Sequence, residues 1–311
     1  MSFNAADVLS DSAYQAITDL RVSDPTAALW AGTERRRRSH LAPTGRLVLI
    51  AADHPARRVS AVGKDALAMA DRRDLLARIQ AILREGLADG VMASMDVLED
   101  LLLLHHMEME AGGEGLLHDT VLVASMNRGG LAATNWEMDD PVTGPSAEAL
   151  ARQGMDGGKL LLRLCPSDTG TLRTMQACAQ AITELNFRRL ACFLEPLAVR
   201  RSDGCFKVLR EATEMARTVG VAQALGDSSH GMWLKLPWCE NFGVVARSTT
   251  LPILLLGGPG SQGMPPFADQ LRQALQDGAN VRGVMVGRSL LYPDNADPVG
   301  AARTIHSLVH G

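Results

Sequence analysis

Short runs of apolar residues recur eight times along this chain of 311 residues, with helical patterns between them. Each run is continuously apolar instead of alternating, which is typical of a parallel strand that is covered on both faces. Eight such units in one chain predict an α/β fold, a (β/α)8 or TIM barrel. The runs span residues 46–52, 90–95, 120–126, 159–164, 189–194, 231–236, 251–256 and 281–286.

The segments between the runs have helical periodicity. In residues 70–88 the apolar side chains fall on one helical face. Similar patterns occur in 97–110, 168–186, 204–219, 264–277 and 296–309. A flavodoxin-like or Rossmann sheet is the alternative architecture. A Rossmann sheet needs GxGxxG after its first strand, whereas Ala-Ala-Asp-His-Pro (51–55) follows the first run here.

The first 44 residues precede the predicted barrel. Residues 10–38 have helical patterning, so we expect 1–44 to be an N-terminal helical extension that caps the closed end of a barrel spanning 45–311. The connection 127–158 is long and rich in Gly and Asp. Loops of that length are often functional, so this one is a candidate active-site lid.

Composition narrows the classes of function. The net charge is −4, and basic residues are spread along the chain except for Arg35 to Arg38, which we interpret as a solvated helix end. We therefore expect no nucleic-acid partner. No apolar run approaches the ~20 residues of a membrane span, and no signal-peptide pattern opens the chain. Five cysteines without CxxC spacing predict reduced thiols in a cytoplasmic protein.

Polar residues or glycines follow every predicted strand. In a (β/α)8 barrel the carboxyl ends of the strands meet at one mouth, where the active site forms. This pattern exceeds what a purely structural barrel needs, and therefore predicts an enzyme-like site. In chain order these residues are Asp53, His54, Asp96, Asn127, Arg163, Glu195, Lys235, Gly257, Gly258, Gly287 and Arg288.

Lys235 is the most informative of these residues because the segment around it, 231–238, is otherwise apolar. Burial disfavours the ammonium form and lowers the pKa of a lysine. A neutral amine is a nucleophile that forms a Schiff base with a carbonyl carbon. The alternative is a strand lysine held in an ion pair. Two strands that end in glycine follow Lys235, which favours the catalytic interpretation.

Three further charged residues are candidates for proton transfer and polarisation. Asp53 leaves an apolar strand, although it could instead cap the next helix. Glu195 is either a proton-transfer group or a buried partner of a lysine. Lys159 shares strand parity with Arg163, which would turn both inward, or it is the solvated first residue of its strand. Inside the lumen, Lys159 would lower the pKa of Lys235.

The glycines after the last two strands predict a phosphate site. Gly257 and Gly258 let backbone N–H groups converge on an anion. Gly287 and Arg288 place a helix start and a guanidinium beside it. Loops after the seventh and eighth strands commonly hold phosphate in this fold. A phosphorylated small molecule is therefore the expected partner.

The remaining candidates are expected to bind substrate, and no metal or other cofactor is expected. The substrate-binding candidates are His54, Asp96, Asn127, Arg128 and Arg163. For Arg128 the alternative is a glycine-rich turn held by local hydrogen bonds. His105, His106, Glu108 and Glu110 lie on a predicted helix with a solvated face and lack HExxH spacing, so they predict no metal site.

Several of these motifs resemble one family over roughly residues 45–308. Ala-Asp-His (52–54), Lys-Leu-Leu-Leu-Arg-Leu (159–164), Leu-Glu-Pro (194–196) and Leu-Lys-Leu-Pro (234–237) are similar to strand segments of class I, Schiff-base (β/α)8 aldolases. That family includes bacterial tagatose-bisphosphate and archaeal-type fructose-bisphosphate aldolases. The resemblance implies that Lys235 is the Schiff-base lysine.

A narrower group is more similar still. Met-Asn-Arg-Gly-Gly-Leu-Ala (126–132), Asp-Asp-Pro-Val-Thr-Gly (139–144) and Gly-Gly-Lys (157–159) resemble uncharacterised aldolase-like barrels whose genes often sit among those for inositol catabolism. Two departures from the aldolase pattern bear on the substrate. His54 replaces the usual Gln or Gly, and Arg163-Leu164 replaces Tyr-Tyr.

The resemblance and the residues together predict a metal-free class I aldolase for a phosphorylated keto-sugar or keto-acid, acting as a homo-oligomer. The substrate implied by the narrower group is 2-deoxy-5-keto-gluconate 6-phosphate, with Arg163 or Arg128 binding its carboxylate. Two alternatives remain open. One is a phosphate-binding isomerase or epimerase without a Schiff base, and the other is a non-catalytic sugar-phosphate sensor.

Overall fold

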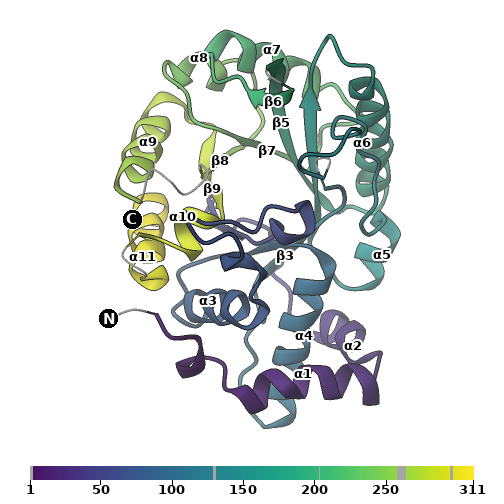
Figure 1. The fold of residues 1–311 in the computed structure, drawn as a ribbon, viewed down its shortest axis with the longest axis vertical. Helices are drawn as coiled ribbons and strands as arrows, with labels where there is room; N and C mark the ends of the chain where they lie inside the picture. Colours follow the sequence, from purple (N-terminus) through teal and green to yellow (C-terminus); the bar gives the residue numbers. More distant parts are fainter. Residues whose placement is uncertain (1–2, 129–130, 203, 258–263, 295–296) are drawn as a thin grey trace.

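The computed structural model describes residues 3–128, 131–202, 204–257, 264–294 and 297–311. Within them, eight parallel strands form a closed barrel surrounded by helices, as predicted (Figure 1). The barrel strands are β1 (Leu47–Ala51), β2 (Gly90–Ala93), β3 (Val121–Ser125), β4 (Gly157–Leu164), β5 (Ala191–Ser202), β7 (Met232–Leu236), β8 (Ile253–Leu256) and β9 (Val281–Val286). Pairing of β4 with β5 closes the barrel.

Helices cover the outer face of the strands. All residues of β1, β2 and β3 are buried, because one face packs against helices and the other fills the lumen. The helices are α1 (Asp11–Ser23), α2 (Ala27–Glu34), α3 (Arg72–Arg84), α4 (Met95–Glu110), α5 (Ala147–Arg152), α6 (Gly170–Phe187), α7 (Ala212–Ala222), α8 (Phe242–Ala246), α9 (Met264–Asp277), α10 (Arg288–Leu291) and α11 (Pro298–His310). Across the described part of the chain, none of them combines the length and apolarity that crossing a membrane requires.

The lumen contains an apolar layer, here called the lumen layer. Its members are Leu47, Leu49, Ala51, Met92, Val121, Val123, Phe193, Leu254 and Met285. Because strand side chains alternate, the inward residue two positions further along a strand lies nearer the mouth. Directly beyond β1 and on β5 that residue is charged: Asp53 lies two positions after Ala51, and Glu195 two positions after Phe193. The lumen is therefore apolar in its interior and charged near the mouth.

The helix predicted over 204–219 is wrong in its first half. Strand β5 continues beyond the barrel to Ser202 and pairs with an antiparallel strand, β6 (Cys205–Val208). Gly204 makes the reversal possible, since its φ of 78° is a conformation that glycine adopts at low cost. Helix α7 begins only at Ala212. The resulting hairpin stands above the mouth at β5.

The N-terminal residues pack against the barrel in two ways. Helices α1 and α2 lie outside it beside α4 (Figure 1). The following Arg35 is not part of a solvated helix end, as the sequence suggested, because it is only 3% exposed. Its guanidinium donates to the carbonyls of Thr120 and Gly154 at 2.8 and 2.9 Å and pairs with Asp156 at 2.6 Å. This contact ties the segment after α2 to the amino ends of β3 and β4.

Candidate active site

Four charged side chains meet in the lumen near the mouth, and we call them the charged quartet: Asp53, Lys159, Glu195 and Lys235. Glu195 Oε2 lies 2.9 Å from Lys159 Nζ and 2.9 Å from Lys235 Nζ. Lys159 Nζ also contacts Asp53 Oδ2 at 3.2 Å. All four residues are buried, and Lys159 is wholly inaccessible. Two basic and two acidic side chains thus pair with one another in a site that is buried from water.

Strand geometry explains why these residues meet. Phe193 and Glu195 on β5 have the same parity, as do Trp233 and Lys235 on β7, and the carboxylate is turned into the lumen with both ammonium groups. Lys159 is the third residue of β4, so the alternative that it is a solvated first strand residue is wrong. The structure brings together all four residues that the sequence proposed for catalysis.

The two carboxyl groups of the charged quartet are ionised. Burial alone would raise the pKa of Glu195, but the ammonium groups of Lys159 and Lys235 outweigh it and lower that pKa to about 2. Burial opposes ionisation of Asp53 as well. The charge of Lys159, with help from Arg57, nevertheless holds the pKa of Asp53 far below its usual range. Both groups therefore act as anions and hydrogen-bond acceptors at neutral pH.

The two lysines of the charged quartet differ in accessibility. Burial lowers the pKa of Lys235, the charge of Glu195 partly restores it, and the charge of Lys159 lowers it again. Lys235 lines a cavity of about 210 Å³ at the mouth, together with Glu195. Lys159 and Asp53 lie beneath that cavity and do not line it. Lys235 is therefore the lysine that a bound ligand can reach.

This mouth cavity is strongly basic. Besides Lys235 its wall contains three arginines, Arg57, Arg210 and Arg288, and a single carboxylate, Glu195. Sequence reasoning missed Arg57 and Arg210. Arg57 ends a short 3₁₀ helix, Pro55–Arg57, directly after β1, and Arg210 follows β6 of the unpredicted hairpin. Arg57 could have been found from its place after a strand end, whereas Arg210 depends on the hairpin.

The predicted phosphate site lies at one side of this cavity. Gly257, Gly287 and Arg288 all line it, while Gly258 falls outside the described residues. A Cβ added at Gly287 would lie 2.5 Å from the Ala51 carbonyl oxygen, so only glycine fits there. Arg288 Nε is buried and has no hydrogen-bond partner among the described residues. A guanidinium nitrogen that has no partner in the described part of the chain, beside two glycines, fits an anionic ligand.

Asp53 and His54 offer two more unpaired atoms beside the mouth cavity. Asp53 Oδ1 and His54 Nδ1 are 3.7 Å apart, and neither has a hydrogen-bond partner in the part of the chain that the structure describes. Burial lowers the pKa of His54 to about 3, with Asp53 opposing the shift, so the imidazole is neutral. A neutral imidazole and a carboxylate oxygen together suit a substrate hydroxyl group.

Asp96 and Asn127 lie apart from the mouth cavity. Asp96 is on α4, where its half-exposed side chain pairs with Arg72. Asn127 is buried and bonds the backbone of Leu161 twice, accepting from its N–H at 2.7 Å and donating to its carbonyl at 2.8 Å. The observed role of Asn127 is to join the end of β3 to β4.

Arg163 and Arg128 also lie apart from it. Arg163 forms an ion pair with Glu137, and Arg128 Nε donates to Thr143 Oγ1 at 3.2 Å. Both partners belong to the long connection 127–158, whose course the strand pattern does not predict. Arg128 lines a different cavity, of about 630 Å³, near the ends of β2 and β3. Arg57 lines this cavity together with Arg128 and also lines the mouth cavity.

The described residues contain no group of three or more His, Cys, Asp or Glu side chains that could hold a metal ion. The helix face of His105, predicted to be solvated, is in part buried. His105 is 2% exposed, and its Nδ1 accepts a hydrogen bond of 3.1 Å from the Leu117 N–H. This histidine therefore supports the loop before β3.

Comparison with known proteins identifies a family and solved structures that this chain resembles. The Cgl0159-like family model matches residues 45–306. The crystal structure of Cgl0159 from Corynebacterium glutamicum is 37% identical in sequence, with a TM-score of 0.90 over 97% of this chain and 98% of that chain. No curated protein matches the chain.

Aldolases have the same fold at much lower identity. The fructose-bisphosphate aldolase from Slackia heliotrinireducens is 16% identical, with a TM-score of 0.64 over 99% of this chain and 92% of that one. An archaeal fructose 1,6-bisphosphate aldolase is 17% identical, with a TM-score of 0.60 over 91% of this chain and 98% of that one. These likenesses show an aldolase-like TIM barrel.

Proposed function

The chain belongs to the Cgl0159-like family. We propose that it is a class I aldolase that cleaves a carbon–carbon bond through a Schiff base on Lys235. One observation carries the proposal. Lys235 Nζ is buried, lies 2.9 Å from Glu195 Oε2 and borders a basic cavity that a ligand can enter. A lysine whose pKa is lowered by burial and by a second lysine, next to a carboxylate that can accept its proton, suits imine formation.

The reaction would begin with transfer of a proton from the Lys235 ammonium group to Glu195, which leaves a neutral amine. Its amine attacks the substrate ketone, and the hydroxyl group of the carbinolamine leaves as water after Glu195 returns a proton. The resulting iminium ion accepts the electron pair of the breaking carbon–carbon bond. Lys159 would hold Glu195 and Asp53 in place through its contacts with both carboxylates.

Asp53 is the proposed base for the cleavage step. Its Oδ2 is held by Lys159, and its Oδ1 has no partner among the described residues. Because Asp53 lies beneath the mouth cavity, that oxygen would accept the proton of the substrate hydroxyl group by way of His54, which lines the cavity, as this group becomes an aldehyde. His54, neutral and unpaired at Nδ1, would orient the same hydroxyl group.

The substrate is a phosphorylated ketose or keto-acid with an anionic group at its other end. Gly257, Gly287 and Arg288 would bind the phosphate, and Arg57 or Arg210 would bind the second anion. Within this class we propose 2-deoxy-5-keto-gluconate 6-phosphate, which carries a phosphate, a ketone and a carboxylate. Its cleavage yields dihydroxyacetone phosphate and malonate semialdehyde.

Trapping of the imine tests this proposal directly. The chain has only four lysines, and Lys64 and Lys207 are exposed, so the modified peptide is easily assigned. Borohydride added with dihydroxyacetone phosphate should reduce the imine and leave one adduct, on the peptide that contains Lys235. Lys64→Met, a matched surface control, should trap normally, and Lys235→Met should not trap. An adduct on Lys159 would reverse the assignment, and no adduct would favour an isomerase.

A further inference from the structure

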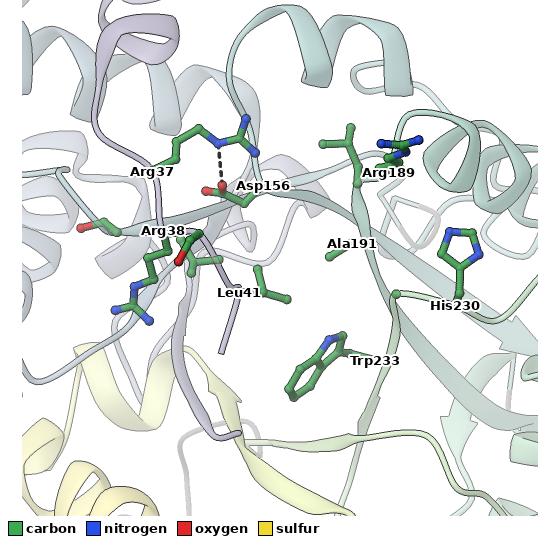
Figure 2. Close-up of a pocket in the computed structure, with 13 residues that line it drawn as sticks. Arg37, Arg38, Leu41, Asp156, Arg189, Ala191, His230 and Trp233 are labelled. Atoms are coloured by element: carbon green, nitrogen blue, oxygen red, sulfur yellow. Dashed lines mark hydrogen bonds and ion pairs between the residues drawn. The ribbon is translucent and has the colours of Figure 1, made fainter. Parts of the chain in front are cut away.

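A second large cavity lies at the opposite end of the barrel from the mouth. It has a volume of about 590 Å³, within the usual range of small-molecule sites. Its wall comes from the amino ends of β3, β4, β5 and β7 and from the segment after α2. Figure 2 shows Arg37 and Arg38 on one side of this cavity, Arg189 and His230 on the other, and Trp233 below. We call it the basal cavity.

The inner part of the basal cavity is apolar and contains an aromatic ring. Trp233 is partly exposed and stacks on Phe193 of the lumen layer, with ring centroids 6.2 Å apart and an interplanar angle of 28°. Leu41 and Ala191 lie beside it and also pack against the lumen layer. A flat unsaturated ring could stack on the free part of Trp233 without an unpaired polar group being buried.

The rim of the basal cavity is cationic. Arg37, Arg38, Arg189 and His230 line it, with Asp156 as the carboxylate in the wall. That carboxylate is already shared, because Asp156 pairs with Arg35 at 2.6 Å and with Arg37 at 2.9 Å. Arg38 pairs with Asp89 at 2.9 Å, whereas Arg189 has no ion-pair partner among the described residues, so positive charge still exceeds negative charge along this rim. An anion with several oxygen atoms would meet guanidinium groups from two sides.

Arg189 has an unusual backbone. It follows the end of α6 with a φ of 56°, the left-handed conformation that most often belongs to glycine at this position of a helix end. A residue with a side chain is strained there. The Arg189 side chain is exposed and forms no ion pair or hydrogen bond with the described residues. The left-handed conformation of Arg189 thus has a cost, and no ion pair or hydrogen bond of its side chain with the described residues offsets it.

From these observations we propose that the basal cavity binds a nucleoside monophosphate or a compound of the same chemistry, a flat heteroaromatic ring that carries a phosphate. The ring stacks on Trp233. The phosphate lies between Arg37 and Arg189, with His230 as a further donor. The proposal is independent of the lysine chemistry, because the lumen layer separates the two cavities.

Calorimetric titration of the full chain with AMP, GMP, CMP and UMP tests the proposal. At least one nucleotide should bind, and the matching nucleoside or inorganic phosphate alone should bind about tenfold more weakly, because each lacks half of the interaction. Arg189→Gly should weaken binding about tenfold and should not lower the unfolding temperature, since glycine relieves the strain. Trp233→Leu should also weaken binding.

Two matched variants separate this site from other basic surfaces. Arg188→Ala removes the same charge from the next residue, which pairs with Glu148 and does not line the basal cavity, so affinity should be unchanged. Arg288→Leu removes a cation from the mouth and should also leave nucleotide affinity unchanged. The proposal is overturned if none of the four nucleotides binds at millimolar concentration. It is equally overturned if Arg288→Leu weakens binding while Arg189→Gly does not.

Discussion

Lys159 and Lys235 are held by the same oxygen atom, since Glu195 Oε2 lies 2.9 Å from each Nζ. Their second contacts differ. Lys159 also pairs with Asp53 at 3.2 Å and has no exposed surface, whereas Lys235 borders the mouth cavity. One lysine is thus a structural counterion, and the other is available to a ligand.

The first prediction concerns stability. Lys159→Met would take from Asp53 the lysine with which it pairs at 3.2 Å, and a buried charge that loses its partner typically costs about 3–5 kcal/mol. Lys235→Met leaves Glu195 paired with Lys159, so its unfolding free energy should change by less than about 1 kcal/mol. Urea unfolding of both variants measures the difference. Equal losses would show that the two lysines are equivalent counterions.

The second prediction concerns pH. The folded pKa of His54, about 3, lies below the unfolded value of 6.5, so the unfolded chain binds the proton first as pH falls. The contribution of His54 to stability is therefore complete above pH 6.5 and decreases as pH falls toward 3. His54→Gln should make the decrease in unfolding free energy between pH 6.5 and 4.5 smaller by about 2 kcal/mol. An unchanged slope would show that this imidazole is not desolvated.

The third prediction concerns the second anion of the substrate. Arg57→Leu or Arg210→Leu should raise KM for the keto-acid phosphate about tenfold or more, since a charge-assisted hydrogen bond is lost. Arg163→Leu is the matched control, because its guanidinium pairs with Glu137 away from the cavity. Steady-state kinetics with the keto-acid phosphate and with fructose bisphosphate distinguish these outcomes. A large KM effect of Arg163→Leu alone would restore the prediction made from the sequence.

The fourth prediction compares two glycines. Gly287→Ala would bring a methyl group 2.5 Å from the Ala51 carbonyl oxygen beside the proposed phosphate site, so phosphate affinity and stability should both decrease. Gly220→Ala is the control. Gly220 is exposed in α7, an added Cβ meets nothing within 4 Å, and this change should stabilise the protein by about 0.5–1 kcal/mol. Thermal unfolding and phosphate titration check both variants.

The fifth prediction concerns metals. The described residues contain no cluster of three or more typical metal-binding side chains, and the proposed mechanism uses an iminium ion as the electron sink. Prolonged treatment with EDTA should therefore leave aldol cleavage unchanged. Loss of activity that zinc or magnesium restores would contradict the lysine mechanism.

The fold and the charged quartet could be predicted because both depend on strand periodicity. Continuous apolar runs locate the strands, and the residues after them meet at the mouth whatever the helices do. Arg163 was assigned by the same logic, but its side chain is captured by Glu137 from a loop whose course has no period. Arg35 looked solvated because its partners, Thr120 and Asp156, are 85 and 121 residues away.

The β5–β6 hairpin was missed for a related reason. Residues 204–219 contain enough apolar side chains at helical spacing to suggest one helix. In the structure β5 continues beyond the barrel instead, and Arg201 pairs with Phe206 in a tight hairpin. Arg210 of the mouth cavity follows that hairpin and was missed with it. Extensions beyond a repeating unit are therefore where sequence periodicity stops being informative.

The lumen layer has a consequence for how such a protein can change. Nine apolar side chains fill the barrel axis between the charged quartet and the basal cavity. Substitutions at one end are therefore shielded from the charges at the other. Substitutions could therefore change or remove the basal cavity without disturbing the lysine chemistry. Substitutions at the mouth could likewise change the substrate while the basal cavity stays intact. The two ends of the barrel can thus evolve independently, because the apolar lumen layer lies between them.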